Sequence, residues 1–137
     1  MKPTHNLYFR HATTLWLLIS CLLLASCVQK PVKVSEAERK AQDSIVSSIS
    51  NLDSLVTLQK HMEHEGNLLG SIVAYRELGK RVRNDSQFDD ALRFHSEGLT
   101  QAEALGDTLE VVQALNNIGT DYRRMGVLDL AQDYHYR

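Results

Sequence analysis

The sequence predicts an all-α protein in which antiparallel helix pairs stack along the chain. Apolar or small residues at Leu115, Ile118, Gly119 and Tyr122 share one face of a helix with 3.6 residues per turn. Gly126 then supplies the conformational freedom that a tight turn into a second helix needs. Only two prolines occur in the 137 residues, so the composition does not oppose long helices.

The chain also resembles itself at an offset of forty residues, mostly at packing and turn positions. The matching pairs are Ala74 and Ala114, Leu78 and Ile118, Gly79 and Gly119, Arg83 and Arg123, Phe88 and Leu128, Asp89 and Asp129, Ala91 and Ala131, Phe94 and Tyr134, and His95 and His135. Self-similarity at a fixed period is typical of repeat proteins. Gly119, a poor helix former, is expected to let a neighbouring helix lie close.

The segment from Leu115 to Ala131 has the order L-x-x-I-G-x-x-Y-x-x-x-G-x-L-x-x-A, which resembles a tetratricopeptide repeat. The earlier unit, from Ile72 onward, is a weaker match, with Val82 in place of Tyr and Ser86 in place of the turn Gly. The period is longer than the roughly 34 residues usual for the family and is similar to that of longer-helix bacterial regulators. The resemblance covers about half the chain and implies a right-handed α-solenoid that binds a protein or peptide.

Residues 1–26 are predicted to be an export signal. Two basic residues precede the uncharged apolar run 15–25, which is shorter than the roughly 20 residues needed to span a bilayer. Leu24-Ala25-Ser26-Cys27 resembles the lipobox of bacterial lipoproteins, which implies cleavage between Ser26 and Cys27 and acylation of Cys27. The alternatives are a plain cysteine, a looser lipobox ending at Cys21, and an uncleaved anchor. The expected location is the cell-envelope membrane, lipid-anchored, on the periplasmic side.

The rest of the chain divides into a tether over 27–34, a leading capping helix or degenerate repeat over 35–65, and two repeat units over 66–106 and 107–137. Ser35 and Glu38 are expected to form a capping box, and the sequence leaves open whether the helix breaks near residues 51–53. The leading segment is expected to cover the first unit with its apolar face.

Within the units, Asn67 is expected to cap a helix that ends near Arg83, and the next helix is expected over 87–104. Asp107 and Glu110 are expected to form another capping box. The second unit is cut short, and repeat arrays usually need three units and a polar cap. We therefore expect the chain to be a fragment of a longer protein or the product of a truncated reading frame.

The expected ligand surface is the side of each unit's first helix that faces away from the packing stripe, because the family uses that side. Five of the ten residues mapped there are basic, on a chain with a net charge of −2. The ten are Arg76, Lys80, Arg83, Asn84, Gln113, Asn116, Asn117, Thr120, Arg123 and Arg124. Arginine binds carboxylates through paired donors, so the expected partner is an acidic segment or a chain terminus. The alternative is a solvated charged face.

The histidines support only weaker hypotheses. His61 and His64, with Glu63 and Glu65 nearby, have a spacing that suits a metal site, or else form a solvated helix end. His95 and His135 occupy one repeat position and are expected to be packing residues with one satisfied nitrogen, the alternative being a pH switch. No motif of a phosphate-binding loop, a nucleophile elbow or a dinucleotide site appears.

The sequence thus predicts a membrane-anchored scaffold that binds a protein or peptide, with no catalytic residue, no cofactor and no nucleic acid bound by this segment. The favoured role is the sensory part of a bacterial signalling or transcription-regulating protein, in which an output enzyme would lie outside these residues. The alternatives are a freestanding envelope lipoprotein for assembly or transport, and a metal-binding envelope protein that uses His61 and His64.

Overall fold

A computed structural model describes residues 33–137, and every regular element in that range is an α-helix. The helices run over Glu36–Ser47 (α2), Leu52–His64 (α3), Leu68–Asn84 (α4), Phe88–Leu105 (α5), Thr108–Met125 (α6) and Leu128–Tyr136 (α7). The predicted all-α class is confirmed. The predicted signal segment, with Ser26 and Cys27, lies outside the described residues, as does most of the predicted tether.

Side-chain caps fix where several helices begin. The Ser35 side chain accepts from the backbone N–H of Glu38, and the Glu38 carboxylate accepts from the backbone N–H of Ser35 at 2.8 Å, which confirms this capping box. Asn67 caps α4 by accepting from the Gly70 N–H at 2.9 Å. Asp107 caps α6, but the Glu110 side chain binds elsewhere. Only the Asp107 half of the capping box predicted for Asp107 and Glu110 therefore forms.

The segment 35–65 forms two helices, which resolves the break left open by the sequence. α2 ends at Ser47, and Asn51 caps α3 by accepting from the Ser54 N–H at 3.0 Å. Asparagine favours such a cap over a helix interior because its short side chain bonds the backbone locally. The leading segment therefore supplies a helix hairpin.

The turns after α4 and α6 have the same backbone geometry, forty residues apart. The N–H of Gln87 donates to Val82 O at 2.9 Å, and the N–H of Val127 donates to Tyr122 O at 2.9 Å. Each turn needs one left-handed residue, supplied by Gly126 at φ 80° and by Ser86 at φ 62°. Ser86 is the only non-glycine residue with positive φ in the described range, so the first unit keeps the turn without the glycine.

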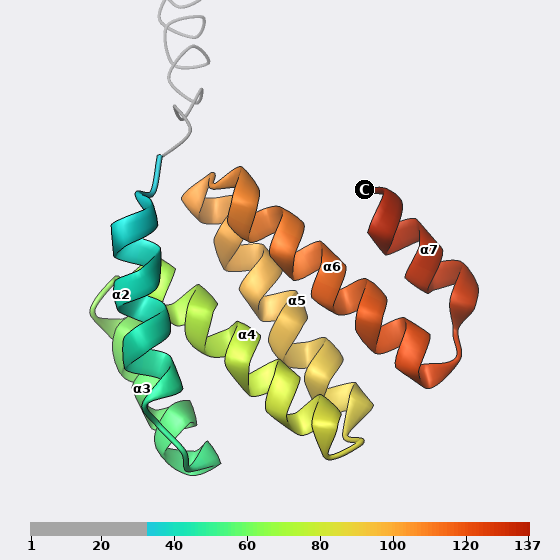
Figure 1. The fold of residues 1–137 in the computed structure, drawn as a ribbon, viewed down its shortest axis with the longest axis horizontal. Helices are drawn as coiled ribbons and strands as arrows, with labels where there is room; N and C mark the ends of the chain where they lie inside the picture. Colours follow the sequence, from blue (N-terminus) through green and yellow to red (C-terminus); the bar gives the residue numbers. More distant parts are fainter. Residues whose placement is uncertain (1–32) are drawn as a thin grey trace, which may run out of the picture. The chain divides into compact units, whose positions relative to one another are not determined.

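α4 lies at the centre of the described helices and contacts α2, α3, α5 and α6. Figure 1 shows α4, α5 and α6 side by side, with α2 and α3 along one flank of α4 and α7 beside α6. One core cluster joins the leading hairpin to α4, as expected for its apolar face. Its buried residues are Val46, Leu55, Met62, Val73, Ala74 and Leu78.

Candidate functional site

Two clusters of charged side chains lie between the helices, and the first is centred on Glu110. The Glu110 side chain is only 1% exposed, at the beginning of α6. It accepts from Arg39 Nη1 at 2.5 Å and from Arg76 Nη1 at 2.8 Å. Arg39 also donates to Asp107 at 2.6 Å, and Arg76 donates to Asp43 at 2.6 Å. This cluster joins α2 and α4 to the N-terminal end of α6.

The charges in this cluster shift one another's ionisation. The hydrogen bond to Asp107 raises the pKa of Arg39 above its ordinary value, against the opposing effect of burial. Burial by itself raises the pKa of Asp107, but the hydrogen bonds from Arg39 and from the Glu110 backbone outweigh it. The pKa of Asp107 therefore lies below its ordinary value. Both groups are held in their charged forms by the fold.

The second cluster is centred on Asp121, whose side chain is fully buried in α6. Arg83 Nη1 of α4 donates to Asp121 Oδ1 at 3.0 Å, and His95 Nδ1 of α5 lies 2.5 Å from Oδ2. His95 Nε2 lies 3.3 Å from the carbonyl oxygen of Arg76. Both ring nitrogens of His95 therefore face acceptors, whereas the sequence suggested one. A buried charge needs such partners because burial without them is costly.

The repeated glycines make room for the repeated histidines. A Cβ atom on Gly79 would collide with the ring of His95, and a Cβ on Gly119 would lie 2.8 Å from the ring of His135. The close approach expected at Gly119 is therefore to an imidazole ring of the following helix. The same glycine–histidine contact occurs in both units.

The predicted ligand residues fall into separate places. Arg76 and Arg83 lie on the predicted face, but both are half-buried and paired with Glu110 and Asp121. The sequence did not lead us to predict Glu110 and Asp121 as partners of these two arginines. A signal was present, because Glu110 and Asp121 stand at helical spacing with the buried Ala114 and so interrupt an apolar stripe.

Half of the predicted residues do meet in one surface hollow of about 460 Å³ on α2, α4 and α6. It is lined by Asp43, Arg76, Lys80, Gln113, Asn116 and Asn117. Asn84 lines a different hollow with Ser50, Leu52, Arg81 and Asp85. The hollow of about 460 Å³ is not lined by the remaining four predicted residues, which are Arg83, Thr120, Arg123 and Arg124. The Thr120 hydroxyl donates to the carbonyl of Asn116 at 2.8 Å, within its own helix.

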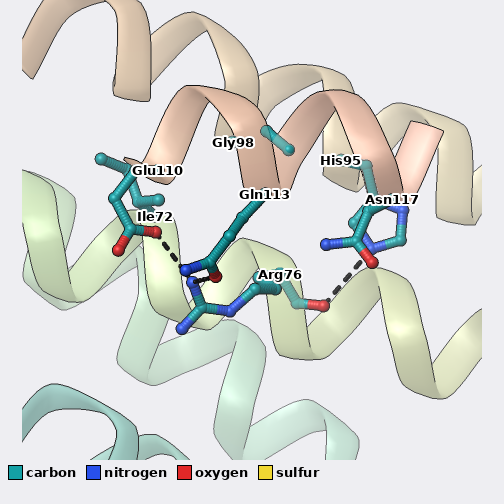
Figure 2. Close-up of a pocket in the computed structure, with 8 residues that line it drawn as sticks. Ile72, Arg76, His95, Gly98, Glu110, Gln113 and Asn117 are labelled. Atoms are coloured by element: carbon teal, nitrogen blue, oxygen red, sulfur yellow. Dashed lines mark hydrogen bonds and ion pairs between the residues drawn. The ribbon is translucent and has the colours of Figure 1, made fainter. Parts of the chain in front are cut away.

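A smaller void between α4, α5 and α6 shares Arg76, Gln113 and Asn117 with this hollow. Figure 2 shows the Arg76 guanidinium reaching Glu110 and Gln113 on one side and the His95 ring near Asn117 on the other. The void measures about 10 Å³, which suits at most one water molecule. The open hollow with Lys80 is therefore the better place for a ligand.

The structure adds no support for a metal site at His61 and His64. His61 and His64 are exposed near the end of α3, and no group of three or more potential metal ligands occurs within residues 33–137. No helix among these residues is long and apolar enough to cross a bilayer.

Comparison of the chain with protein-family models, curated proteins and solved structures finds no match.

Proposed function

We propose that this chain is a tetratricopeptide-like, non-enzymatic binding module whose hollow at Lys80 binds an acidic peptide segment or a free C-terminal carboxylate. The forty-residue repeat, the glycine–histidine contact in both units and the stacking of α4, α5 and α6 support the repeat class. The observation that carries the binding proposal is the lining of the hollow, which combines the two cations Arg76 and Lys80 with three amides, one carboxylate, Asp43, and no apolar side chain.

The available donors in the hollow differ from those favoured by the sequence. Arg76 is occupied by Glu110 and Asp43, so its guanidinium serves mainly to hold the wall of the hollow. Lys80 is partly exposed, and its ammonium lies 3.7 Å from Glu77, a loose pair that leaves donors free. The amide groups of Asn116 and Asn117 each offer two further donors to a carboxylate or peptide backbone.

Charge reversal at Lys80 tests the proposal. The probe is a pool of fluorescent hexapeptides rich in Asp and Glu, made with free or amidated C-termini, with binding measured by anisotropy. A hydrogen bond to a charged group contributes about 1.5–3 kcal/mol, so Lys80→Glu should weaken binding roughly 10- to 100-fold. Asn116→Asp should weaken it in the same direction.

The matched control is Lys60→Glu, on the exposed side of α3 and away from the hollow. It should leave the affinity unchanged while altering the net charge equally. Equal binding of acidic and neutral pools, or equal losses for Lys80→Glu and Lys60→Glu, would overturn the proposal. Preference for free over amidated peptides identifies a C-terminal carboxylate as the ligand group.

We further propose that Cys27 is acylated after export and anchors the module to the cell-envelope membrane. The support is the lipobox-like Leu24-Ala25-Ser26-Cys27 behind a short apolar run. Labelling of cells with an alkyne palmitate analogue should mark the wild-type protein and not Cys27→Ser. Equal labelling of both would exclude this anchor.

The wider role that we favour is the sensory part of a signalling or transcription-regulating protein, with a freestanding envelope scaffold as the second candidate. Sequencing the gene beyond the codon for Arg137 separates them. A single apolar stretch of about 20 residues followed by an output domain supports the sensor. An immediate stop codon supports the scaffold.

A further inference from the structure

α2 lies at the edge of the described helices, along one flank of α4 (Figure 1), and buries little apolar surface there. Val46 is the one buried residue of α2, and it joins the core cluster shared with α3 and α4. Ala37 and Ala41 are exposed, and Ile45 is 46% exposed. Helices with few buried apolar contacts open more easily than the core of a fold. The position of α2 therefore depends on its polar contacts.

Charged side chains attach the first two turns of α2 to the rest of the fold. Arg39 donates to Asp107 and to Glu110, at the beginning of α6. Asp43, one turn after Arg39, accepts from Arg76 Nη2 of α4 at 2.6 Å. The Glu110 side chain is 1% exposed, whereas the Asp43 side chain is 55% exposed. When a pair with an exposed carboxylate breaks, that carboxylate regains its hydration, so such a pair contributes little net free energy. The pair of Asp43 with Arg76 is thus the attachment that another carboxylate can replace.

Asp43 holds the guanidinium edge that a carboxylate of the ligand would otherwise bind. Both Asp43 and Arg76 line the hollow at Lys80. Arg76 Nη1 is bound by Glu110 and Gln113. Its Nη2 bonds to Asp43 instead. Arginine matches the geometry of a carboxylate better than lysine does, so α2 blocks the strongest donor for a carboxylate in the hollow.

We propose that Asp43 is an internal competitor of the ligand in the hollow at Lys80, and that its displacement loosens α2. The Asp43 carboxylate occupies Arg76 Nη2 until a carboxylate of the ligand takes its place. This regulation rests on the function proposed above for the hollow. The hollow is then partly self-inhibited, and ligand binding changes the order of the helix that precedes the first repeat unit.

The exchange keeps the charges at Arg76 balanced. One carboxylate replaces another on Nη2, while Glu110 stays on Nη1. The displaced Asp43 side chain is already half-exposed and completes its hydration by rotating into water. α2 loses one of its two charged attachments and keeps those of Arg39 and Val46, so it loosens without unfolding.

The affinity of an acidic peptide for Asp43→Asn tests the competition. The probe is the fluorescent pool of Asp- and Glu-rich hexapeptides with free C-termini, and the full-length chain is held in detergent micelles. The competing pair is exposed on one side and its net contribution is small, so Asp43→Asn should bind the pool roughly fivefold more tightly than the wild type. The matched control is Asp133→Asn, exposed on α7 and outside the lining of the hollow. It changes the net charge equally and should bind as the wild type does.

Hydrogen exchange of the α2 amides, measured by mass spectrometry, separates displacement of Asp43 from simple charge repulsion. Saturating peptide should speed exchange in α2 of the wild type relative to α5, because the pair with Arg76 breaks. Unliganded Asp43→Asn should already show this faster exchange, and the peptide should not raise it further. Repulsion alone would leave the exchange of α2 unchanged on binding.

The outcomes for the hollow and for its regulation are separable. Equal affinities of the wild type and Asp43→Asn, with Lys80→Glu weakening both, would overturn the competition and leave the hollow as the ligand site. Affinities that Lys80→Glu does not change would overturn both. An equal gain for Asp133→Asn would assign the effect to net charge and overturn the competition. Unchanged or slower exchange in α2 on binding would do the same, since the ligand would leave the pair of Asp43 with Arg76 intact.

Discussion

Removal of the Glu110 carboxylate should destabilise the fold more than removal of any exposed acid. The Glu110 side chain is almost fully buried and accepts from Arg39 at 2.5 Å and from Arg76 at 2.8 Å. In Glu110→Ala both guanidiniums lose this counter-charge in a poorly solvated position. Breaking a buried ion pair by removing one partner costs about 3–5 kcal/mol.

The structure places the expected cost at the lower end of that range, about 3 kcal/mol. Each arginine keeps one carboxylate, Asp107 for Arg39 and Asp43 for Arg76, and Asp43 is exposed to water. A domain of this size has a total stability of about 5–15 kcal/mol, so the loss is a large fraction of it. It corresponds to a fall in Tm of roughly 10–20 °C.

Urea denaturation followed by circular dichroism at 222 nm measures the change in the free energy of unfolding. The control is Glu36→Ala, which removes an exposed pair with Lys40 in the same protein. Exposed helix pairs of this spacing contribute about 0.3–0.5 kcal/mol, so the control should be nearly silent. A loss below about 1 kcal/mol for Glu110→Ala would refute the account of the buried charge.

A combined variant separates lost charge from lost packing. In an Asp107→Asn background, which keeps the cap without its charge, replacing Arg39 and Arg76 by Met and Glu110 by Leu removes the remaining buried charges while keeping side-chain volume, and the last member, Asp43, is exposed to water. Apolar replacement of a whole buried ion cluster is often neutral or stabilising, so most of the stability should return. If the combined variant is as unstable as Glu110→Ala, the cost arises from packing and not from unpaired arginines.

Three further predictions concern pH, close packing and backbone strain. The folded-state pKa of Asp107 lies below its ordinary value. The contribution of the Asp107 carboxylate to the stability of the fold is therefore complete above pH ~4 and is lost as the pH falls through the folded pKa. Asp107→Asn, which keeps the cap, should flatten that acid loss in urea titrations at pH 3–6. Gly79→Ala should lower the free energy of unfolding by about 1–3 kcal/mol because its Cβ meets the buried ring of His95. Gly119→Ala should lower it by less because the facing ring of His135 is exposed, and equal losses in urea denaturation would contradict this. Ser86→Gly should raise the stability by about 0.5–1 kcal/mol because φ at Ser86 is 62°, and a lower Tm would show that the turn is unstrained.

Local features were predictable because their causes lie within a few residues of sequence. The caps at Ser35 and Asn67 follow from side chains that bond a backbone N–H three residues later. The turn at Gly126 follows from the need for one left-handed residue. The forty-residue repeat gave the helix order and the packing stripe, and the glycine–histidine contact explains why both residues recur together.

The candidate site was predictable only in part. Lys80, Asn116 and Asn117 do line one hollow on the predicted face. Arg76, one of the ten predicted ligand residues, is instead held by acids on two other helices. Its bond to Glu110 spans 34 residues of sequence, and that of Arg83 to Asp121 spans 38.

The amino-acid sequence by itself determined that residues 33–137 are helical, where most of their helices begin and end, and which residues of each helix share a face. Only the tertiary structure decided which faces meet and therefore which charges neutralise one another. The physical reason is that helical periodicity depends on backbone geometry within one helix. The pairing of Asp121 with His95, by contrast, depends on how α5 and α6 are rotated and spaced when they pack.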